Sequence, residues 1–189
     1  MPHYTALAVH LSAWCALRRG EVLGLTVADF IDLDSDKPLL LVARQVVEKR
    51  YGTDPQIGPT KRNKVTKKQI PTDLVPLIKA QIETYTDGTP KAFIFPSRKN
   101  SHAAVAGRTF EQQFNEARAA AKITKHVTPH SLRHTGLTFY GNQGATLAEI
   151  MERAGHSDIK AAMIYQHATQ ERDVQNTAKL NPLVAESLK

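Results

Sequence analysis

The sequence has few of the features that would stabilise a protein by special chemistry or direct it to a membrane. It has one cysteine, Cys15, so no disulfide can form within the chain. No apolar run approaches the roughly 20 residues that a membrane-crossing helix requires, and the amino terminus lacks the pattern of a signal peptide. We therefore expect a soluble, cytoplasmic protein in which Cys15 is a small core residue.

Acidic residues are scarce relative to basic ones. The chain has 25 lysines and arginines against 18 aspartates and glutamates, and its formal net charge is +7. This excess favours a polyanionic partner, although composition alone does not distinguish DNA from RNA or an anionic membrane. The cations cluster between residues 44 and 68, where the only acids are Glu48 and Asp54, and this clustering indicates a nucleic-acid-binding surface. The basic members of the segment are Arg44, Lys49, Arg50, Lys61, Arg62, Lys64, Lys67 and Lys68.

Length and hydrophobic periodicity predict one mainly helical domain. The chain has 189 residues, of which 41% are hydrophobic, and this is enough for one good core. Apolar residues recur at helical spacing in several segments. The predicted helices are Tyr4 to Leu17, Glu21 to Leu25, Leu74 to Tyr85, Arg108 to Lys122, Ser131 to Asn142, Leu147 to Ala154 and the segment that carries Ile159 to Tyr165.

A small antiparallel sheet is predicted between the second and third helices. Thr26 to Asp36 is acidic and typical of turns, whereas Leu39 to Val47 is rich in apolar and β-branched residues and predicts a strand. Gly58 and Pro59 are expected to break the chain. The basic run from Thr60 to Pro71 then predicts a second strand, and a third if it folds back, in a hairpin that could reach a DNA groove.

One predicted helix begins with polar groups that packing alone does not select. Thr128 or Ser131 can cap it, and Pro129 suits its first turn. His130 and Arg133 are three residues apart, so they project from one helix face one turn apart. An imidazole beside a guanidinium suits a phosphodiester, because one group can transfer a proton while the other binds non-bridging oxygens.

Other polar side chains lie next to predicted helix ends. Arg18 and Glu21 fall where the first helix ends and the second begins, a corner from which Arg18 can point into a cleft. Gly155 is placed to close another helix in the left-handed conformation, and His156 follows at once. Tyr165 comes nine residues after His156, on the last predicted helix.

Three segments together resemble the signature motifs of the tyrosine recombinases, the phage integrase family. They are ALRRGEVL from Ala16, TPHSLRHT from Thr128, and GHSDI from Gly155 with IYQH ending at His167. Their order and separations are similar to those of the family. The resemblance covers nearly the whole chain, from about Tyr4 to Asn181.

The resemblance implies an α+β, mainly helical catalytic domain with a small antiparallel sheet. This domain would occupy residues 1–189, with a core at about 4–175 and a tail at 176–189, and the family's amino-terminal core-binding domain would be absent from this chain. The implied activity is site-specific recombination, used to integrate and excise phage or mobile-element DNA. The reaction would need no cofactor and no metal.

The resemblance also implies how the strand is broken. Tyr165 would be the nucleophile, giving a 3′-phosphotyrosine and a free 5′-hydroxyl, so that rejoining needs no nucleotide. Arg18 and Arg133 would bind the non-bridging oxygens of the phosphate, and Glu21 would orient Arg18.

The resemblance also assigns proton transfer and further phosphate binding to two histidines and a lysine. His130 would accept the proton near the phenol and bind the phosphate, and His156 would add a hydrogen bond to it. Lys61 would protonate the departing 5′-oxygen. Lys64 is the alternative, because the segment before Pro71 is a few residues longer than the family's hairpin. Further DNA contacts are expected from Arg44, Arg62, Lys64, Lys67 and Lys68.

The expected partner is double-stranded DNA in the cytoplasm of a bacterial host, at the nucleoid. The chain would be a monomer off DNA and a homotetramer on it, and Tyr165 could act in its own site or in a neighbour's. Three alternatives share parts of the evidence: a type IB topoisomerase, a non-catalytic DNA-binding relative and a metallo-phosphoesterase. The last would use the histidines His130, His134, His156 and His167, although their spacing is not that of a known metal site. His134 and His167 are instead expected to be packed or hydrogen-bonded neighbours.

Overall fold

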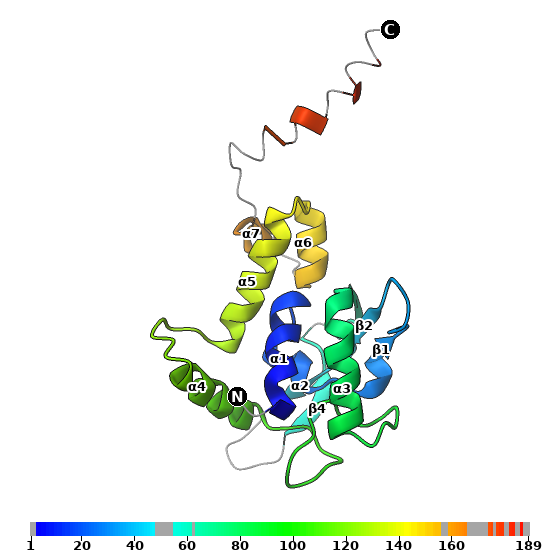
Figure 1. Cartoon of the computed structure of the whole chain (residues 1–189), viewed down its shortest axis with the longest axis vertical. Coiled ribbons are helices and arrows are strands. Elements are labelled where there is room, and N and C mark those ends of the chain that lie inside the picture. The colour runs from blue at the N-terminus through cyan, green and yellow to red at the C-terminus, as the bar shows by residue number, and fades with distance from the viewer. Residues whose placement is uncertain are drawn as a thin grey trace.

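The computed structural model describes residues 3–47, 55–61, 63–155 and 159–165, together with positions 174–175, 177–179, 182–183 and 186. The helices are α1 (His3–Trp14), α2 (Arg19–Leu23), α3 (Val75–Tyr85), α4 (Gly107–Ala120), α5 (Pro129–Asn142), α6 (Leu147–Ala154) and α7 (Ile159–Met163) (Figure 1). The strands are β1 (Phe30–Ile31), β2 (Leu39–Val42), β3 (Arg44–Val47), β4 (Gln56–Pro59) and β5 (Thr66–Gln69). The predicted α+β, mainly helical class is confirmed. Within the part of the chain that the structure describes, no helix has the length and apolar content needed to span a bilayer.

The strands form two small antiparallel sheets, one with the order β1-β2-β5 and one of β3 and β4. β2 and β3 follow each other with only Ala43 between them. β2 pairs with β5, with Val42 opposite Thr66, and β3 pairs with β4, with Arg44 opposite Pro59. The connection between β4 and β5, residues 60–65, therefore lies opposite Ala43. β1 pairs with the other edge of β2.

This arrangement corrects the predicted position of the hairpin. The chain reverses between β3 and β4, and Lys61 and Lys64 lie in the connection between β4 and β5, which pair with β3 and β2 in turn. β4 also crosses Gly58 and Pro59, which the sequence predicts as chain breakers. Pro59 is compatible with a strand here because β3 is the one described neighbour of β4, so no second ladder requires its missing N–H.

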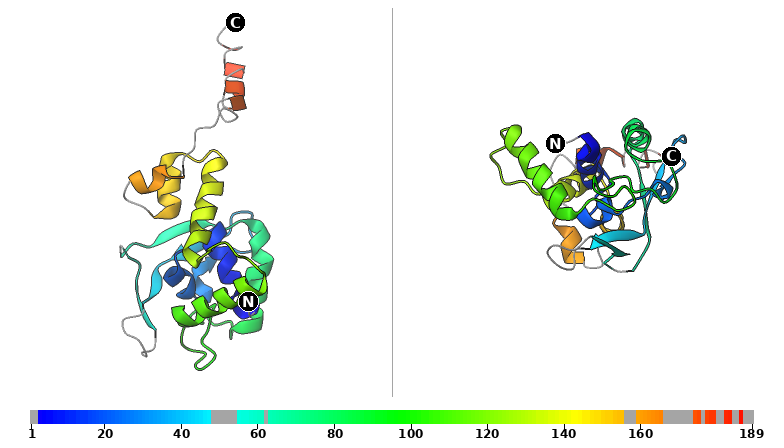
Figure 2. Two further views of the ribbon diagram at one scale, coloured as in Figure 1. Left: turned by 90° about the vertical axis from the view of Figure 1, so that its left-hand side faces the viewer. Right: turned by 90° about the horizontal axis from the view of Figure 1, so that it is seen from below.

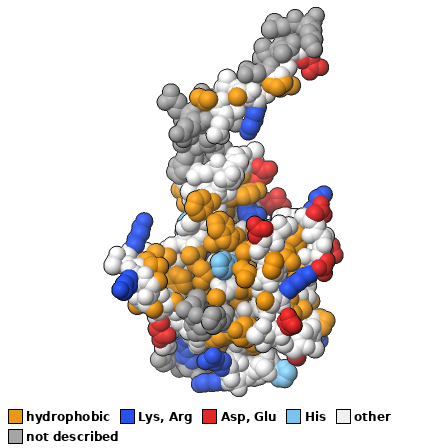
Figure 3. All heavy atoms as spheres, viewed as in Figure 1, with side chains coloured by type: hydrophobic (Ala, Val, Ile, Leu, Met, Phe, Trp, Pro, Cys, Tyr) orange, Lys and Arg blue, Asp and Glu red, His pale blue; other side chains and the backbone are white. Residues whose placement is uncertain are grey.

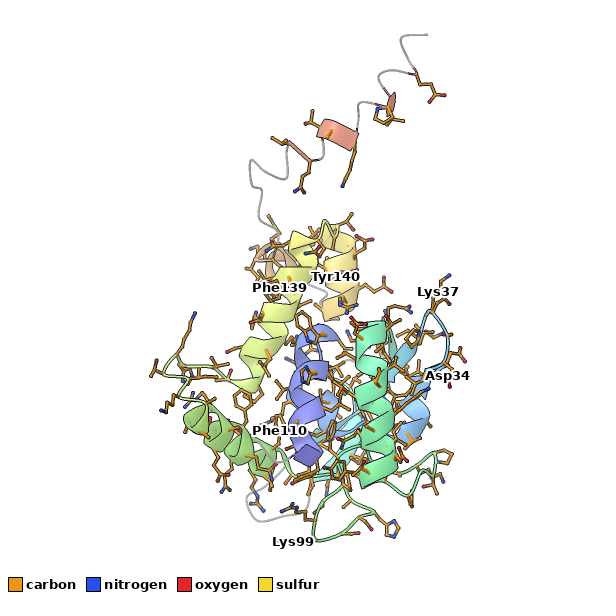
Figure 4. All side chains as sticks on the ribbon, in the orientation of Figure 1. Asp34, Lys37, Lys99, Phe110, Phe139 and Tyr140 are labelled. Atoms are coloured by element: carbon orange, nitrogen blue, oxygen red, sulfur yellow. The ribbon has the colours of Figure 1, made fainter. Side chains whose placement is uncertain are left out.

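Most of the apolar core surrounds α1. Leu11 is fully buried in α1, Leu40 in β2 and Ile78 in α3, and Phe110 lies between α4 and α1 (Figure 4). Cys15 is also fully buried in this cluster, which confirms its prediction as a core residue. Burial raises the pKa of its thiol to about 11. This core fixes α1, the sheet and α3 as one body.

A smaller cluster joins α5, α6 and α7 at one end of the molecule (Figures 1 and 2). α5 connects the two clusters by crossing α1 at Gly136, where an added Cβ would lie 1.7 Å from the Ala13 carbonyl oxygen. Only glycine permits this close backbone approach. Beside the crossing, Trp14 and Phe139 stack with ring centroids 6.0 Å apart and remain half exposed. Figure 3 shows hydrophobic side chains gathered on this face of the molecule.

Candidate active site

Arg133 is held in the interior by the ends of two helices. Its side chain is only 2% exposed, and its two terminal nitrogens donate to the carbonyl oxygens of Ala16 and Ala154. Ala154 ends α6 and Ala16 follows α1, where carbonyl groups lack partners within the helix and carry its negative end charge. Burial, and then Arg18, lower the pKa of Arg133 to about 10, so its guanidinium remains charged at neutral pH.

The cap at the start of α5 fixes the helix face that carries His130 and Arg133. The Thr128 side chain accepts a hydrogen bond from the Ser131 amide at 3.2 Å, and the Ser131 hydroxyl accepts one from the Thr128 amide at 3.2 Å. This reciprocal cap makes Thr128 the N-cap, so α5 begins at Pro129, two residues before the predicted start at Ser131. It places His130 and Arg133 one turn apart on the helix.

Arg18 is oriented by Glu21, as the sequence predicts. One Arg18 guanidinium nitrogen lies 2.8 Å from Glu21 Oε1, and the Arg18 amide donates to Oε2 at 2.8 Å. Glu21 is buried, whereas the Arg18 side chain is 31% exposed. One carboxylate thus fixes both the backbone and the side chain of Arg18 at the start of α2, and the guanidinium keeps access to solvent.

A cleft of about 460 Å³ opens beside Arg18, between the 60–65 loop and the end of α6. Lys61 and Lys64 both line it, and both are exposed. Thr60 holds the loop, because its hydroxyl donates to the Lys64 carbonyl at 2.8 Å and accepts from the Lys64 amide at 3.1 Å. The loop therefore brings both lysines to the same cleft, and either ammonium could meet a phosphodiester there.

Lys68 does not belong to the exposed basic surface on which the sequence analysis placed it. It is 5% exposed on β5, and its ammonium donates to the Arg153 carbonyl oxygen near the end of α6. Burial, and then the charge of Arg133, lower the pKa of Lys68 to about 8. Lys68 also lines the cleft, but its burial and its bond to Arg153 make it a link between β5 and α6 and not part of an exposed basic surface.

The Arg44 side chain also forms its polar contacts within the protein. Its guanidinium lies 2.5 Å from Asp29 Oδ2 and donates to the Thr26 hydroxyl at 3.0 Å. Because Asp29 is buried, this contact fixes the turn before β1 and balances the arginine charge. Of the other predicted DNA contacts, Lys64 and Lys67 are exposed, and Arg62 lies outside the described residues.

Tyr165 lies in the site of its own chain. It follows α7, is 2% exposed and packs in the smaller cluster with Leu137 and Ile150. Its carbonyl oxygen is so close to α5 that an added Cβ on Gly141 would lie 2.3 Å away. Burial raises the pKa of the phenol, an effect that the nearby charge of Arg133 opposes.

The hydroxyl of Tyr165 contacts His134. Tyr165 Oη lies 2.5 Å from His134 Nδ1, and His134 Nε2 lies 2.9 Å from His130 Nε2. His130, which the sequence analysis places nearest the phenol, thus reaches the hydroxyl through His134. The sequence predicts His134 only as a packed or hydrogen-bonded neighbour, and its spacing of four residues from His130 is the signal that places the two rings on one helix face. His156 lies outside the described residues.

Comparison with known proteins identifies the family of this chain. A model of the phage integrase family matches residues 1–172. The chain belongs to the phage integrase family. The putative prophage phiRv2 integrase of Mycobacterium tuberculosis is 34% identical over 184 residues, covering 97% of this chain and 48% of that protein. The integrase of Mycobacterium phage L5 is 31% identical over 178 residues, covering 90% of this chain and 45% of that protein.

This integrase-family chain thus spans about half the length of the curated relatives it matches. Among solved structures, the Tn1549 transposon integrase in complex with transposon right end DNA has a TM-score of 0.74 at 20% identity, covering 94% of this chain and 59% of that chain. The XerA recombinase has a TM-score of 0.66 at 21% identity, covering 94% and 58%. The fold is therefore that of the catalytic domains of tyrosine recombinases.

Proposed function

We propose that this chain is the catalytic domain of a site-specific DNA recombinase that cuts and rejoins strands through a 3′-phosphotyrosine. The observation that carries the proposal is the position of Tyr165, whose hydroxyl lies among basic groups of its own chain. Arg133 acts on it electrostatically, and His134 contacts it directly. Support for DNA as the substrate comes from the integrase relatives and from the DNA in the Tn1549 integrase complex.

The arrangement suits attack on a phosphodiester. Arg18, which keeps access to solvent, supplies a positioned guanidinium group that would neutralise the charge that builds on the non-bridging oxygens, and the buried Arg133 adds its positive charge beside it. Loss of one such positioned donor typically costs about 3 kcal/mol of transition-state stabilisation. Lys61, or Lys64 beside it, would give a proton to the departing 5′-oxygen. His156 is proposed to donate a further hydrogen bond to the phosphate.

The partners follow from the same proposal. The substrate would be double-stranded DNA, bound across the cleft beside Arg18 with contacts from Lys64, Lys67 and Arg62. Residues 1–189 would form one catalytic domain with a core at about 4–175, and the chain would be monomeric off DNA and tetrameric on it. The reaction would take place at the nucleoid in the bacterial cytoplasm, to integrate or excise phage or mobile-element DNA.

Covalent trapping tests this function. A pool of labelled duplexes with a randomised core and a nick near its centre lets the short 5′-hydroxyl fragment diffuse away, so that a 3′-linked adduct accumulates. The protein should form an adduct that survives denaturing electrophoresis, also in excess EDTA. Tyr165→Phe should form none and retain DNA affinity, whereas Tyr85→Phe, a change far from the cleft, should behave as wild type. An adduct in Tyr165→Phe, or none in wild type, would refute the proposal.

A mixing experiment tests whether Tyr165 serves its own site. Tyr165→Phe lacks the nucleophile but keeps Arg133, whereas Arg133→Ala lacks that arginine but keeps Tyr165. Each variant alone should therefore be inactive. Because Tyr165 packs against α5 of the same chain, the mixture should also be inactive. Adducts in the mixture would show that the tyrosine is delivered to a neighbouring protomer.

A further inference from the structure

A chain of hydrogen-bonding groups runs from the buried phenol to the surface. It begins at Tyr165 Oη, passes through both ring nitrogens of His134 and ends at His130, which is exposed. The His130 and His134 rings are nearly perpendicular, with centroids 4.5 Å apart, and the His134 and Tyr165 rings are 5.5 Å apart. Each neutral imidazole has one nitrogen that donates and one that accepts. His134 can therefore accept from the phenol at Nδ1 while it donates to His130 at Nε2.

The electrostatic surroundings keep both imidazoles able to accept a proton. Burial lowers the pKa of His134, with further contributions from His130 and Arg133. Burial likewise lowers the pKa of His130, helped by Arg133 on α5 and by Arg18 at the start of α2. Both rings are thus neutral at pH 7. The phenol pKa is raised by burial, so its ionisation needs a base in direct contact.

We propose that His134 is a catalytic residue that takes the Tyr165 proton during attack and passes its own proton to His130. This inference rests on the proposed strand-cleavage function. The phenol O–H bond breaks as His134 Nδ1–H forms, and the His134 Nε2–H bond breaks as His130 Nε2–H forms. The phenol oxygen bonds to phosphorus as the 5′-oxygen leaves with a proton from Lys61 or Lys64.

The proton transfer places the positive charge on His130, at the exposed end of the hydrogen-bonded chain. His134 ends the step neutral, and His130 becomes an imidazolium at the exposed end of the chain. There it can face the phosphate, whose negative charge offsets the repulsion from Arg133 and Arg18. Rejoining runs the same steps in reverse and returns the proton to Tyr165.

Two variants of His134 separate proton transfer from packing. Asparagine places an amide oxygen near the position of Nδ1, so His134→Asn keeps an acceptor for the phenol but cannot take up a proton. We expect His134→Asn to form adduct about 100-fold more slowly or worse, the usual contribution of a positioned base. Its DNA affinity and melting temperature should match those of wild type. His10→Gln, on the exposed side of α1, is the matched control and should react at the wild-type rate.

Rescue by added bases and the pH profile supply the decisive readouts. His134→Ala leaves space beside the phenol, so free imidazole should raise its adduct rate in proportion to the neutral base, and more basic imidazoles should rescue better. Arg133→Ala should show no such rescue. The wild-type rate should level off above the histidine pKa values, whereas the rate of His134→Asn should keep rising with pH toward the raised pKa of the phenol.

The possible outcomes separate the relay from the function on which it rests. A wild-type protein that forms no adduct refutes the recombinase function, and the relay with it. Normal adduct formation on Tyr165 in wild type, with unchanged rates in both His134 variants, refutes the relay alone. A slow His134→Ala that imidazole does not rescue, with a wild-type pH profile, would show that His134 only packs.

Discussion

Replacing Lys68 with methionine should change how the stability of this protein depends on pH. Lys68 is buried on β5, donates to the Arg153 carbonyl, and faces the charges of Arg133 and Arg153. Methionine fills similar space without a charge. The substitution therefore removes the titration of one buried group while the packing between β5 and α6 is largely kept.

The size and sign of the effect follow from the pKa of Lys68. Burial lowers it from its ordinary value of 10.5 to about 8. Between these values the unfolded chain binds a proton that the folded chain lacks, so rising pH stabilises the folded state. Each pKa unit corresponds to about 1.4 kcal/mol, so this group contributes about 3 kcal/mol in total, most of it between about pH 8 and pH 10. Below about pH 8 the folded protein must hold the buried charge, and the contribution is absent.

Urea unfolding at several pH values measures this pH dependence of the free energy of unfolding directly. The proteins compared are wild type, Lys68→Met and Lys67→Met. The free energy of unfolding of wild type, relative to Lys68→Met, should rise by about 2 to 3 kcal/mol from pH 7 to pH 10. Lys67→Met is the matched control, because Lys67 is exposed on the same strand, and its curve should run parallel to wild type. Parallel curves for wild type and Lys68→Met, or a relative loss of wild-type stability as pH rises, would refute the reasoning.

Two further substitutions test the geometry of the cleft. Gly141→Ala should slow adduct formation at least about tenfold in single-turnover assays without weakening DNA binding. The reason is that the new methyl would displace the Tyr165 backbone, and overpacking typically costs about 1 to 3 kcal/mol. An unchanged rate would mean that the placement of Tyr165 against α5 is irrelevant to cleavage. Lys61→Ala should slow cleavage strongly, and a 5′-bridging phosphorothiolate should restore the rate, since sulfur leaves without a proton; if this behaviour appears in Lys64→Ala instead, Lys64 is the acid.

The sequence predicts well those features that depend on neighbours in the chain. Thr128 caps α5, and Gly155 ends α6 in the left-handed conformation with φ of 58°. Arg18 and Glu21 form the predicted pair. Each of these contacts spans only a few residues, so local spacing determines the geometry.

Features that depend on strand register and distant contacts escape such reasoning. Lys67 and Lys68 differ in burial because successive strand residues face opposite sides, and only the pairing with β2 determines which side is buried. Both look equally suited to DNA in the sequence. The contact between His134 and Tyr165 joins α5 to the turn after α7, and it requires the smaller cluster to hold the two together.

The residue that carries the DNA tests the central claim most directly. Tryptic digestion of the trapped adduct should release the peptide from Ala161 to Arg172, which contains a single tyrosine, Tyr165. After nuclease treatment, mass spectrometry should find a 3′-linked nucleotide phosphate on Tyr165 of this peptide and on no other residue. A modification on another tyrosine or on a serine, with the peptide unmodified, would contradict the account.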